Sequence, residues 1–150
     1  MDRLGPAGGY AVVSPGASAQ QAYKKPPADL LVGACGRLAV RDTAALVVYG
    51  PGEESDARGV VEAAGGTATL APPTRLPTLA ALLRNARLFV GGDSGPLHMA
   101  CAVGCPVAGI YGPTDPRVNQ PWGVPYRVLH PENRLYTGVK RLDREAGAFE

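Results

Sequence analysis

The sequence predicts one α/β domain, a parallel sheet with helices on both faces. Short apolar runs of strand length alternate along the chain with helical segments, which is typical of βαβ units. With 150 residues, 45% of them hydrophobic and 19% charged, the chain is long enough to bury a core. We place the domain at residues 10–134, after a Gly- and Pro-rich start at 1–9 that we expect to be a linker or disordered. A polar tail is expected at 135–150.

The expected strands are apolar runs, several of them bounded by polar or glycine-rich turns. They lie at 10–14, 45–49, 67–70, 88–90, 106–111 and 126–130. The run at 88–90 is continuously apolar, which suits a strand that is covered on both faces. Its surroundings make it the centre of the predicted sheet.

The expected helices show apolar residues at helical spacing or begin with a proline. They lie at 27–40, from about 54 to 64, at 76–86 and at 96–103. In the helix at 27–40 the residues expected to face the core are Leu30, Leu31, Ala34, Cys35 and Leu38. In the helix at 76–86 they are Leu79, Leu82 and Leu83.

Four loops follow the carboxyl ends of predicted strands, at 15–27, 50–54, 91–96 and 112–116. Ligands of open parallel sheets bind at this edge. The loops carry polar residues and glycines, and we expect them to frame a nucleotide-sized pocket together.

The turn after the strand at 88–90 is the candidate anion site. Gly91 and Gly92 allow a bend and a close approach of the backbone. Pro96 suits the start of a helix, with Ser94 or Gly95 as its N-cap. The N–H groups of the first helical turn and the positive end of the helix dipole favour an anion, most naturally a phosphate.

Composition argues against several other classes of protein. The net charge of +2 comes without a Lys/Arg cluster, so no nucleic-acid partner is expected. No apolar run is long enough to span a membrane, and the N-terminus shows no signal-peptide core. The chain has no P-loop, and Gly50-Pro51-Gly52 lacks the third glycine of a dinucleotide fingerprint.

The cysteines Cys35, Cys101 and Cys105 form an odd set without a disulfide-like layout, which indicates a reducing compartment. Cys101 and Cys105 are four residues apart, but no second ligand pair accompanies them. We therefore expect buried thiols and no metal site.

Residues 90–107 (VGGDSGPLHMACAVGCPV) and 110–116 (IYGPTDP) resemble the signature of family 9 glycosyltransferases, the ADP-heptose:lipopolysaccharide heptosyltransferases and their relatives. Residues 13–18 (VSPGAS) and 24–27 (KKPP) resemble the family's h-P-G-A-S and K-x-W-P segments, with Pro26 in place of the tryptophan. Residues 49–54 (YGPGEE) resemble its strand-end G-x-x-E loop. The resemblance covers roughly residues 10–123.

The resemblance implies a GT-B architecture, in which two Rossmann-like domains face each other across a cleft. The motifs belong to the C-terminal, nucleotide-sugar-binding half. The implied reaction is inverting transfer from an ADP-linked sugar to a lipopolysaccharide-type acceptor, in the cytoplasm or at the inner membrane, without a metal cofactor. The N-terminal half, with the acceptor site and the catalytic base, has no counterpart before Tyr10, so we expect the chain to need that domain, or a partner chain, for activity.

The resemblance also implies roles for individual residues. Lys24 would neutralise the donor diphosphate, and Asp93 is the second catalytic candidate. Asp93 and His98 would contact the donor sugar or the diphosphate, and the N–H groups near Ser94 and Gly95 would hold a phosphate oxygen. Further donor-binding candidates are Ser18 in the first loop, Pro96 at the helix start, and Glu53 or Glu54, which would accept hydrogen bonds from the ribose hydroxyls.

Other interpretations stand beside these. The chain could be a stand-alone nucleotide-binding module or subunit, another GT-B enzyme such as a UDP-sugar transferase or epimerase, or a fragment without a ligand. Single residues also have structural explanations: a solvated Lys24, acids of a first helical turn at Glu53 and Glu54, and a structural His98. Thr114 and Asp115 are expected to cap a turn, and His130 has no assigned role.

Overall fold

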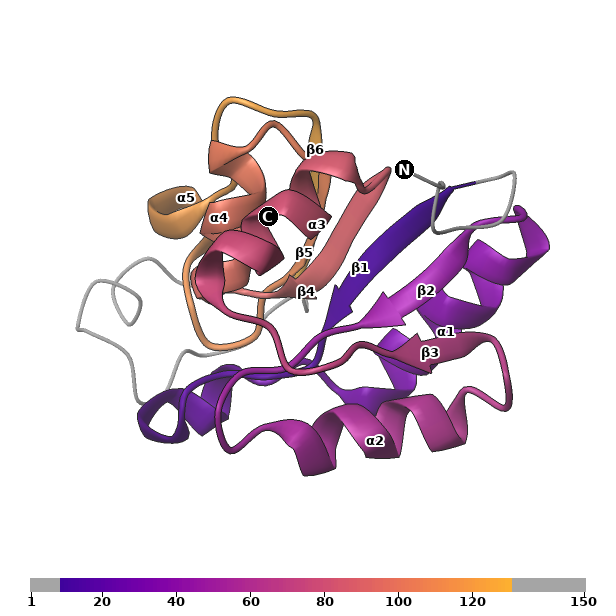
Figure 1. The fold of residues 1–150 in the computed structure, drawn as a ribbon. Helices are drawn as coiled ribbons and strands as arrows, with labels where there is room; N and C mark the ends of the chain where they lie inside the picture. The colour runs from indigo at the N-terminus through magenta and orange to yellow at the C-terminus, as the bar shows by residue number, and fades with distance from the viewer. Residues whose placement is uncertain (1–8, 131–150) are drawn as a thin grey trace.

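The computed structural model describes residues 9–130, which form a six-stranded parallel sheet with helices on both faces (Figure 1). The strands are β1 (Tyr10–Ser14), β2 (Ala44–Val47), β3 (Ala68–Leu70), β4 (Leu88–Gly92), β5 (Val107–Ile110) and β6 (Tyr126–Leu129). The helices are the 3-10 helix η1 (Ala19–Lys24), α1 (Ala28–Val40), α2 (Glu54–Ala63), α3 (Leu76–Asn85), α4 (Gly95–Ala102) and α5 (Pro116–Asn119). The predicted fold class is confirmed.

The strand order is β3-β2-β1-β4-β5-β6, which is the order of a doubly wound Rossmann sheet. The chain first builds outward from β1 to β3, and then returns to add β4 on the other side of β1. In register, Val13 of β1 lies between Val47 of β2 and Val90 of β4. The order reverses between β1 and β4, so their carboxyl ends open the crevice where such sheets bind ligands.

Two hydrophobic cores flank the sheet because neighbouring residues of a strand point to opposite faces. Val13 packs with Leu31 and Cys35 of α1 in the core beneath α1 and α2. Val12 packs in the other core, which α3 and α4 cover. Figure 1 shows the two helix pairs on opposite sides of the sheet. β1 is therefore buried from Ala11 to Ser14, and the loop that follows it starts from a strand covered on both faces.

The prediction of the core face of α1 is wrong at one residue. Leu30 was expected to face the core, but 43% of it is exposed. The buried stripe of α1 is narrower than the apolar pattern and centres on Leu31 and Cys35. Leu82 of α3 is only partly buried, and its carbonyl accepts the hydroxyl of Tyr10 at 2.7 Å.

The loops contain two short helices that the sequence pattern did not indicate. η1 occupies much of the expected loop at 15–27, and α5 begins at the end of the expected loop at 112–116. Residues 1–8 and 131–150, which include most of the expected start segment and the whole polar tail, lie outside the described residues. Within the described range, no helix combines the length and apolar character needed to cross a membrane.

Candidate functional site

Asp93 is the centre of the candidate site. It follows β4 directly, and only 4% of its side chain is exposed. Its Oδ2 accepts a hydrogen bond from Lys24 Nζ at 3.1 Å, and His98 Nε2 lies 3.2 Å from its Oδ1. The structure thus brings together three of the residues that the sequence singled out, although Lys24 and Asp93 are 69 positions apart.

The backbone of Lys24 reaches the end of β4 because Gly92 has no side chain. A Cβ at Gly92 would lie 2.9 Å from the carbonyl oxygen of Lys24 and 3.1 Å from the ring of Pro26. Pro26 is buried, so its ring packs over the strand end where the family motif has a tryptophan. Only 13% of the Lys24 side chain is exposed as a result. This lysine is held in the site and is not a freely solvated surface residue.

The first turn of α4 supplies the backbone donors. Ser94 is the N-cap, with extended backbone angles (φ −148°, ψ 170°), and its side chain makes no capping bond to the helix. Its hydroxyl donates to the carbonyl of Gly92 at 3.3 Å instead. Pro96, the second helical residue, has no N–H to satisfy. The N–H groups at the start of a helix have no partner within it, so those of Ser94 and Gly95 suit an anion beside Asp93 and Lys24.

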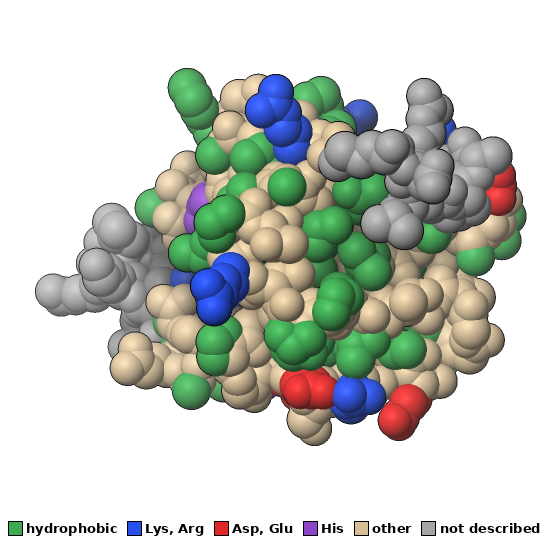
Figure 2. All heavy atoms as spheres, viewed as in Figure 1, with side chains coloured by type: hydrophobic (Ala, Val, Ile, Leu, Met, Phe, Trp, Pro, Cys, Tyr) green, Lys and Arg blue, Asp and Glu red, His purple; other side chains and the backbone are tan. Residues whose placement is uncertain are grey.

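Glu53 and Glu54 have different surroundings. Glu53 precedes α2, and its Oε2 accepts the N–H of Gly50 at 2.8 Å. A Cβ at Gly16 would overlap the Glu53 carboxylate. The side chain of Glu53, in the loop after β2, therefore packs directly against the backbone of Gly16 in the loop after β1. Glu54 forms an exposed ion pair with Arg58 at 2.6 Å. Figure 2 shows acidic and basic side chains next to one another along the lower edge of the molecule, where α2 lies in Figure 1. Of the two, Glu53 is placed at the ligand edge of the sheet.

Ser18 lies at the start of η1 on the same edge. Its side chain is exposed and makes no capping bond to η1, while its carbonyl accepts the N–H of Gln21 at 2.7 Å. The structure therefore places Ser18 beside the lysine-bearing helix with its hydroxyl toward solvent.

The sequence interpretation missed Asn119 at the end of α5. Its side-chain Nδ2 donates to Asp93 Oδ2 at 3.3 Å, and its backbone carbonyl accepts a hydrogen bond from the hydroxyl of Tyr111 at 2.6 Å. Burial raises the pKa of Tyr111, and the negative charge of Asp93 adds to the effect, so the hydroxyl keeps its proton at neutral pH. A helix of four residues leaves no periodic pattern; its only sequence signal is the capping pair Asp115-Pro116.

Asp115 caps α5, as expected. Its Oδ1 accepts the N–H of Arg117 at 2.8 Å, and its Oδ2 accepts the guanidinium Nη2 of the same residue at 3.0 Å. Thr114 is 1% exposed, and its hydroxyl has no hydrogen-bond partner among the described residues. Asp115 therefore fixes the start of α5, whereas the expected turn-capping role of Thr114 is wrong, because its buried hydroxyl bonds to none of the described residues.

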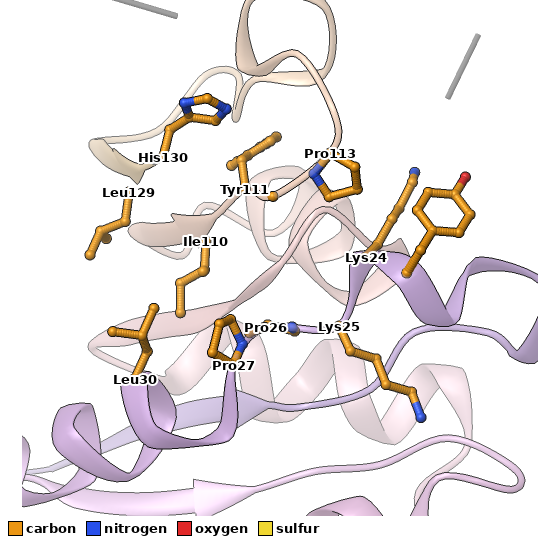
Figure 3. Close-up of a pocket in the computed structure, with 12 residues that line it drawn as sticks. Lys24, Lys25, Pro26, Pro27, Leu30, Ile110, Tyr111, Pro113, Leu129 and His130 are labelled. Atoms are coloured by element: carbon orange, nitrogen blue, oxygen red, sulfur yellow. The ribbon is translucent and has the colours of Figure 1, made fainter. Parts of the chain in front are cut away.

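A pocket of about 370 Å³ lies between the start of α1 and the ends of β5 and β6 (Figure 3). Lys24, Pro27 and Leu30 line it from one side, and Tyr111 and His130 line it from the other. We expected one pocket framed by four loops, but residues 50–54 and 91–96 are not part of this lining. The exposed Leu30 belongs to its wall, which explains why this leucine is not in the core.

The three cysteines are free, but the expectation of a buried thiol is wrong for Cys101. Among residues 9–130 no group of three or more potential metal ligands occurs. Cys35 and Cys105 are buried, whereas Cys101 is partly exposed. Burial raises the pKa of the Cys105 thiol from its ordinary 9.0 to about 11, and the neighbouring Cys101 adds to the shift. The chain therefore offers one accessible thiol.

In a maleimide or DTNB assay of the folded chain at pH 8, Cys101 is expected to react first, with Cys35 and Cys105 reacting only after unfolding. Because the folded pKa of Cys105 is the higher one, its contribution to stability is fully present below pH 9 and is lost as the pH rises toward 11. Mass spectrometry of the labelled sites checks the expected order of thiol labelling, and labelling of Cys105 as fast as Cys101 would contradict the burial of Cys105.

Comparisons with known proteins agree with these motifs. The model of glycosyltransferase family 9 (heptosyltransferase) matches residues 5–148. A lipopolysaccharide heptosyltransferase 3 of Escherichia coli K12 is 36% identical over 127 residues, which cover 81% of this chain and 36% of that protein. A second E. coli protein of that name is 32% identical over 93% of this chain and 45% of its own length. The chain thus spans less than half the length of these curated relatives.

Solved structures share the fold. A family 9 glycosyl transferase from Veillonella parvula superposes with a TM-score of 0.73 at 22% identity, over 87% of this chain and 36% of that chain. The E. coli heptosyltransferase WaaC with ADP gives a TM-score of 0.70 at 25% identity, over 94% and 42%. The resemblance seen in the sequence motifs is confirmed.

Proposed function

The chain belongs to glycosyltransferase family 9, the heptosyltransferase family, and on this basis we propose that it is the donor-binding half of a heptosyltransferase. It binds an ADP-sugar for inverting transfer to a lipopolysaccharide-type acceptor. The observation that carries the proposal is the placement of Lys24, Asp93 and the first turn of α4 together at the crevice between β1 and β4. A neighbouring structure, WaaC, contains ADP.

The site suits a diphosphate leaving group. In glycosyl transfer from a nucleotide sugar, negative charge builds on the departing diphosphate. The N–H groups of Ser94 and Gly95 are held in place before the reaction, and the ammonium of Lys24, which is paired with Asp93 in the free chain, can turn to the diphosphate. Together they can stabilise that charge without a metal. Two kinds of donor, one charged and one from the helix N-terminus, thus act on the same group.

The neighbouring groups suit the sugar parts of the donor. Asp93 and His98 lie beside the phosphate donors and can hydrogen-bond hydroxyls of the transferred sugar. Glu53, at the end of β2, can accept both hydroxyls of the ribose. The donor would then extend along the carboxyl edge of the sheet from β2 to β4.

A second Rossmann-like domain would complete the enzyme. Several elements at the carboxyl edge expose large apolar side chains, namely Tyr23 (45%), Leu76 (69%) and Val118 (59%). We propose that the acceptor domain, in the same protein or in a partner chain, covers this edge and supplies the catalytic base. The chain alone should bind donor without turnover, and the whole enzyme would act in the cytoplasm at the inner membrane. Transfer by the isolated chain would contradict this part.

Glu53→Gln is expected to weaken ADP binding by about 3- to 10-fold, because a neutral amide is a poorer acceptor for two ribose hydroxyls. The effect should vanish with 2′,3′-dideoxy-ADP, which lacks both hydroxyls. Glu54→Gln is the matched control, since Glu54 pairs with Arg58 on the exposed side of α2. Calorimetric titration of the three proteins with both nucleotides measures this, and equal losses in the two variants would remove the role of Glu53.

Calorimetric titration of the purified chain with ADP and, separately, UDP tests the proposal. Saturable binding that favours ADP supports an ADP-sugar site. Tighter binding of UDP would favour a UDP-sugar transferase or epimerase instead. Absence of heat with both nucleotides, from a chain shown to be folded by circular dichroism, would contradict a working donor half.

A further inference from the structure

We propose that Asn119 is a positioning residue, which keeps the Asp93 carboxylate oriented toward the donor sugar when Lys24 turns to the diphosphate. The inference rests on the proposed function of this site. It concerns a residue outside the motifs that identify the family, and it follows from the three groups that share one carboxylate.

The Asp93 carboxylate has an uneven set of partners. Oδ2 accepts hydrogen bonds from Lys24 at 3.1 Å and from Asn119 at 3.3 Å. Among residues 9–130, the one side-chain partner of Oδ1 is His98, at 3.2 Å. Asp93 is nearly fully buried, so loss of a partner leaves a desolvated charge without compensation. The site therefore needs a partner that remains hydrogen-bonded to Asp93 Oδ2 after the donor binds.

Lys24 is poorly suited to be that partner. Its ammonium is the charged group that the proposed function assigns to the diphosphate, which carries more negative charge than one carboxylate. The side chain is long and has several rotatable bonds, so a bound diphosphate can draw it away from Oδ2. A neutral amide has no comparable attraction to the diphosphate.

Asn119 is fixed from two directions. The hydroxyl of the buried Tyr111 donates to the backbone carbonyl of Asn119 at 2.6 Å and ties the end of α5 to the sheet. Asp115 caps the other end of the same helix. The Asn119 amide is thus presented to Asp93 by a short helix anchored at both ends, which is the arrangement expected of a positioning group.

The test compares ADP-heptose with ADP on the wild-type chain and on Asn119→Ala. If Asn119 orients Asp93 for the sugar, the variant should bind ADP-heptose about tenfold more weakly and ADP within about twofold of wild type. Tyr111→Phe should show the same pattern with a smaller loss. The control is Asn85→Ala, which removes an exposed asparagine whose amide donates to a carbonyl of α3. Equal losses for both ligands, or no loss, would overturn the proposal.

A ligand-free measurement separates this inference from the proposed function. In NMR spectra, the side-chain amide resonances of Asn119 should shift on Asp93→Asn, while those of Asn85 stay in place. Failure of the wild-type chain to bind either ligand would count against the donor site itself. Unmoved Asn119 resonances would overturn the positioning role, whatever the binding data show.

Discussion

Lys24→Ala is expected to weaken ADP binding by about 10- to 100-fold, as is usual when a buried, charge-assisted hydrogen bond to a phosphate is removed. Lys24 is the cation placed beside the N-terminus of α4, and only 13% of its side chain is exposed, so solvent screens it little. The variant also leaves Asp93 without its ion-pair partner. A buried unpaired carboxylate would repel the diphosphate, which adds to the loss.

The neighbouring Lys25 provides the matched control. It belongs to the same loop and carries the same charge, but it pairs with Asp56 at 2.5 Å in an ion pair whose two side chains are more than a third exposed. Lys25→Ala should change ADP affinity by less than about threefold, since exposed ion pairs contribute little. If the two variants lose affinity equally, the effect reflects overall charge, and the specific role of Lys24 is wrong.

Gly92→Ala is expected to lower the free energy of unfolding by about 1–3 kcal/mol and to weaken ADP binding at the same time. The added methyl group would lie 2.9 Å from the backbone oxygen of Lys24 and 3.1 Å from the ring of Pro26. Neither neighbour is a flexible side chain, so the segment that carries Lys24 has to move. The Lys24–Asp93 contact at 3.1 Å should open as a result.

Gly59→Ala separates this close contact from a general effect of glycine replacement. A Cβ at Gly59, inside α2, would meet nothing within 4 Å. Alanine should stabilise the helix there by about 0.5–1 kcal/mol and leave ADP affinity unchanged. Urea unfolding and calorimetry on both variants measure the two effects. A Gly92→Ala chain that keeps wild-type stability and affinity would show that the end of η1 is not held against β4.

Local signals were sufficient for the main elements of the fold. The run from Leu88 to Val90, two glycines and a proline predicted a buried strand, a turn and a helix, and the structure has β4 and α4 there with Ser94 as the cap. The strand boundary was wrong by two residues, because Gly91 and Gly92 belong to β4 and not to the turn. Such signals fail where burial depends on distant neighbours. Leu30 matches the apolar pattern of α1, yet its side chain lines a pocket and is not part of the core.

The site was predictable only in part. Lys24 and Asp93 are far apart in sequence, and neither strand nor helix periodicity connects them; only the family motifs paired them. The choice between Glu53 and Glu54 needed the loop geometry, which turns the first toward Gly16 and the second toward Arg58. Asn119 carries no motif, and its contact with Asp93 arises from the packing of α5 alone.

The most direct test of the account is a two-dimensional ¹H–¹⁵N NMR titration of the chain with ADP. The account predicts the largest shifts at the backbone amides of Ser94 and Gly95, with further changes at Lys24 and around Glu53. These changes should saturate together with the calorimetric binding curve. Saturable shifts confined to other parts of the chain, with the start of α4 unaffected, would contradict a donor site at the crevice between β1 and β4.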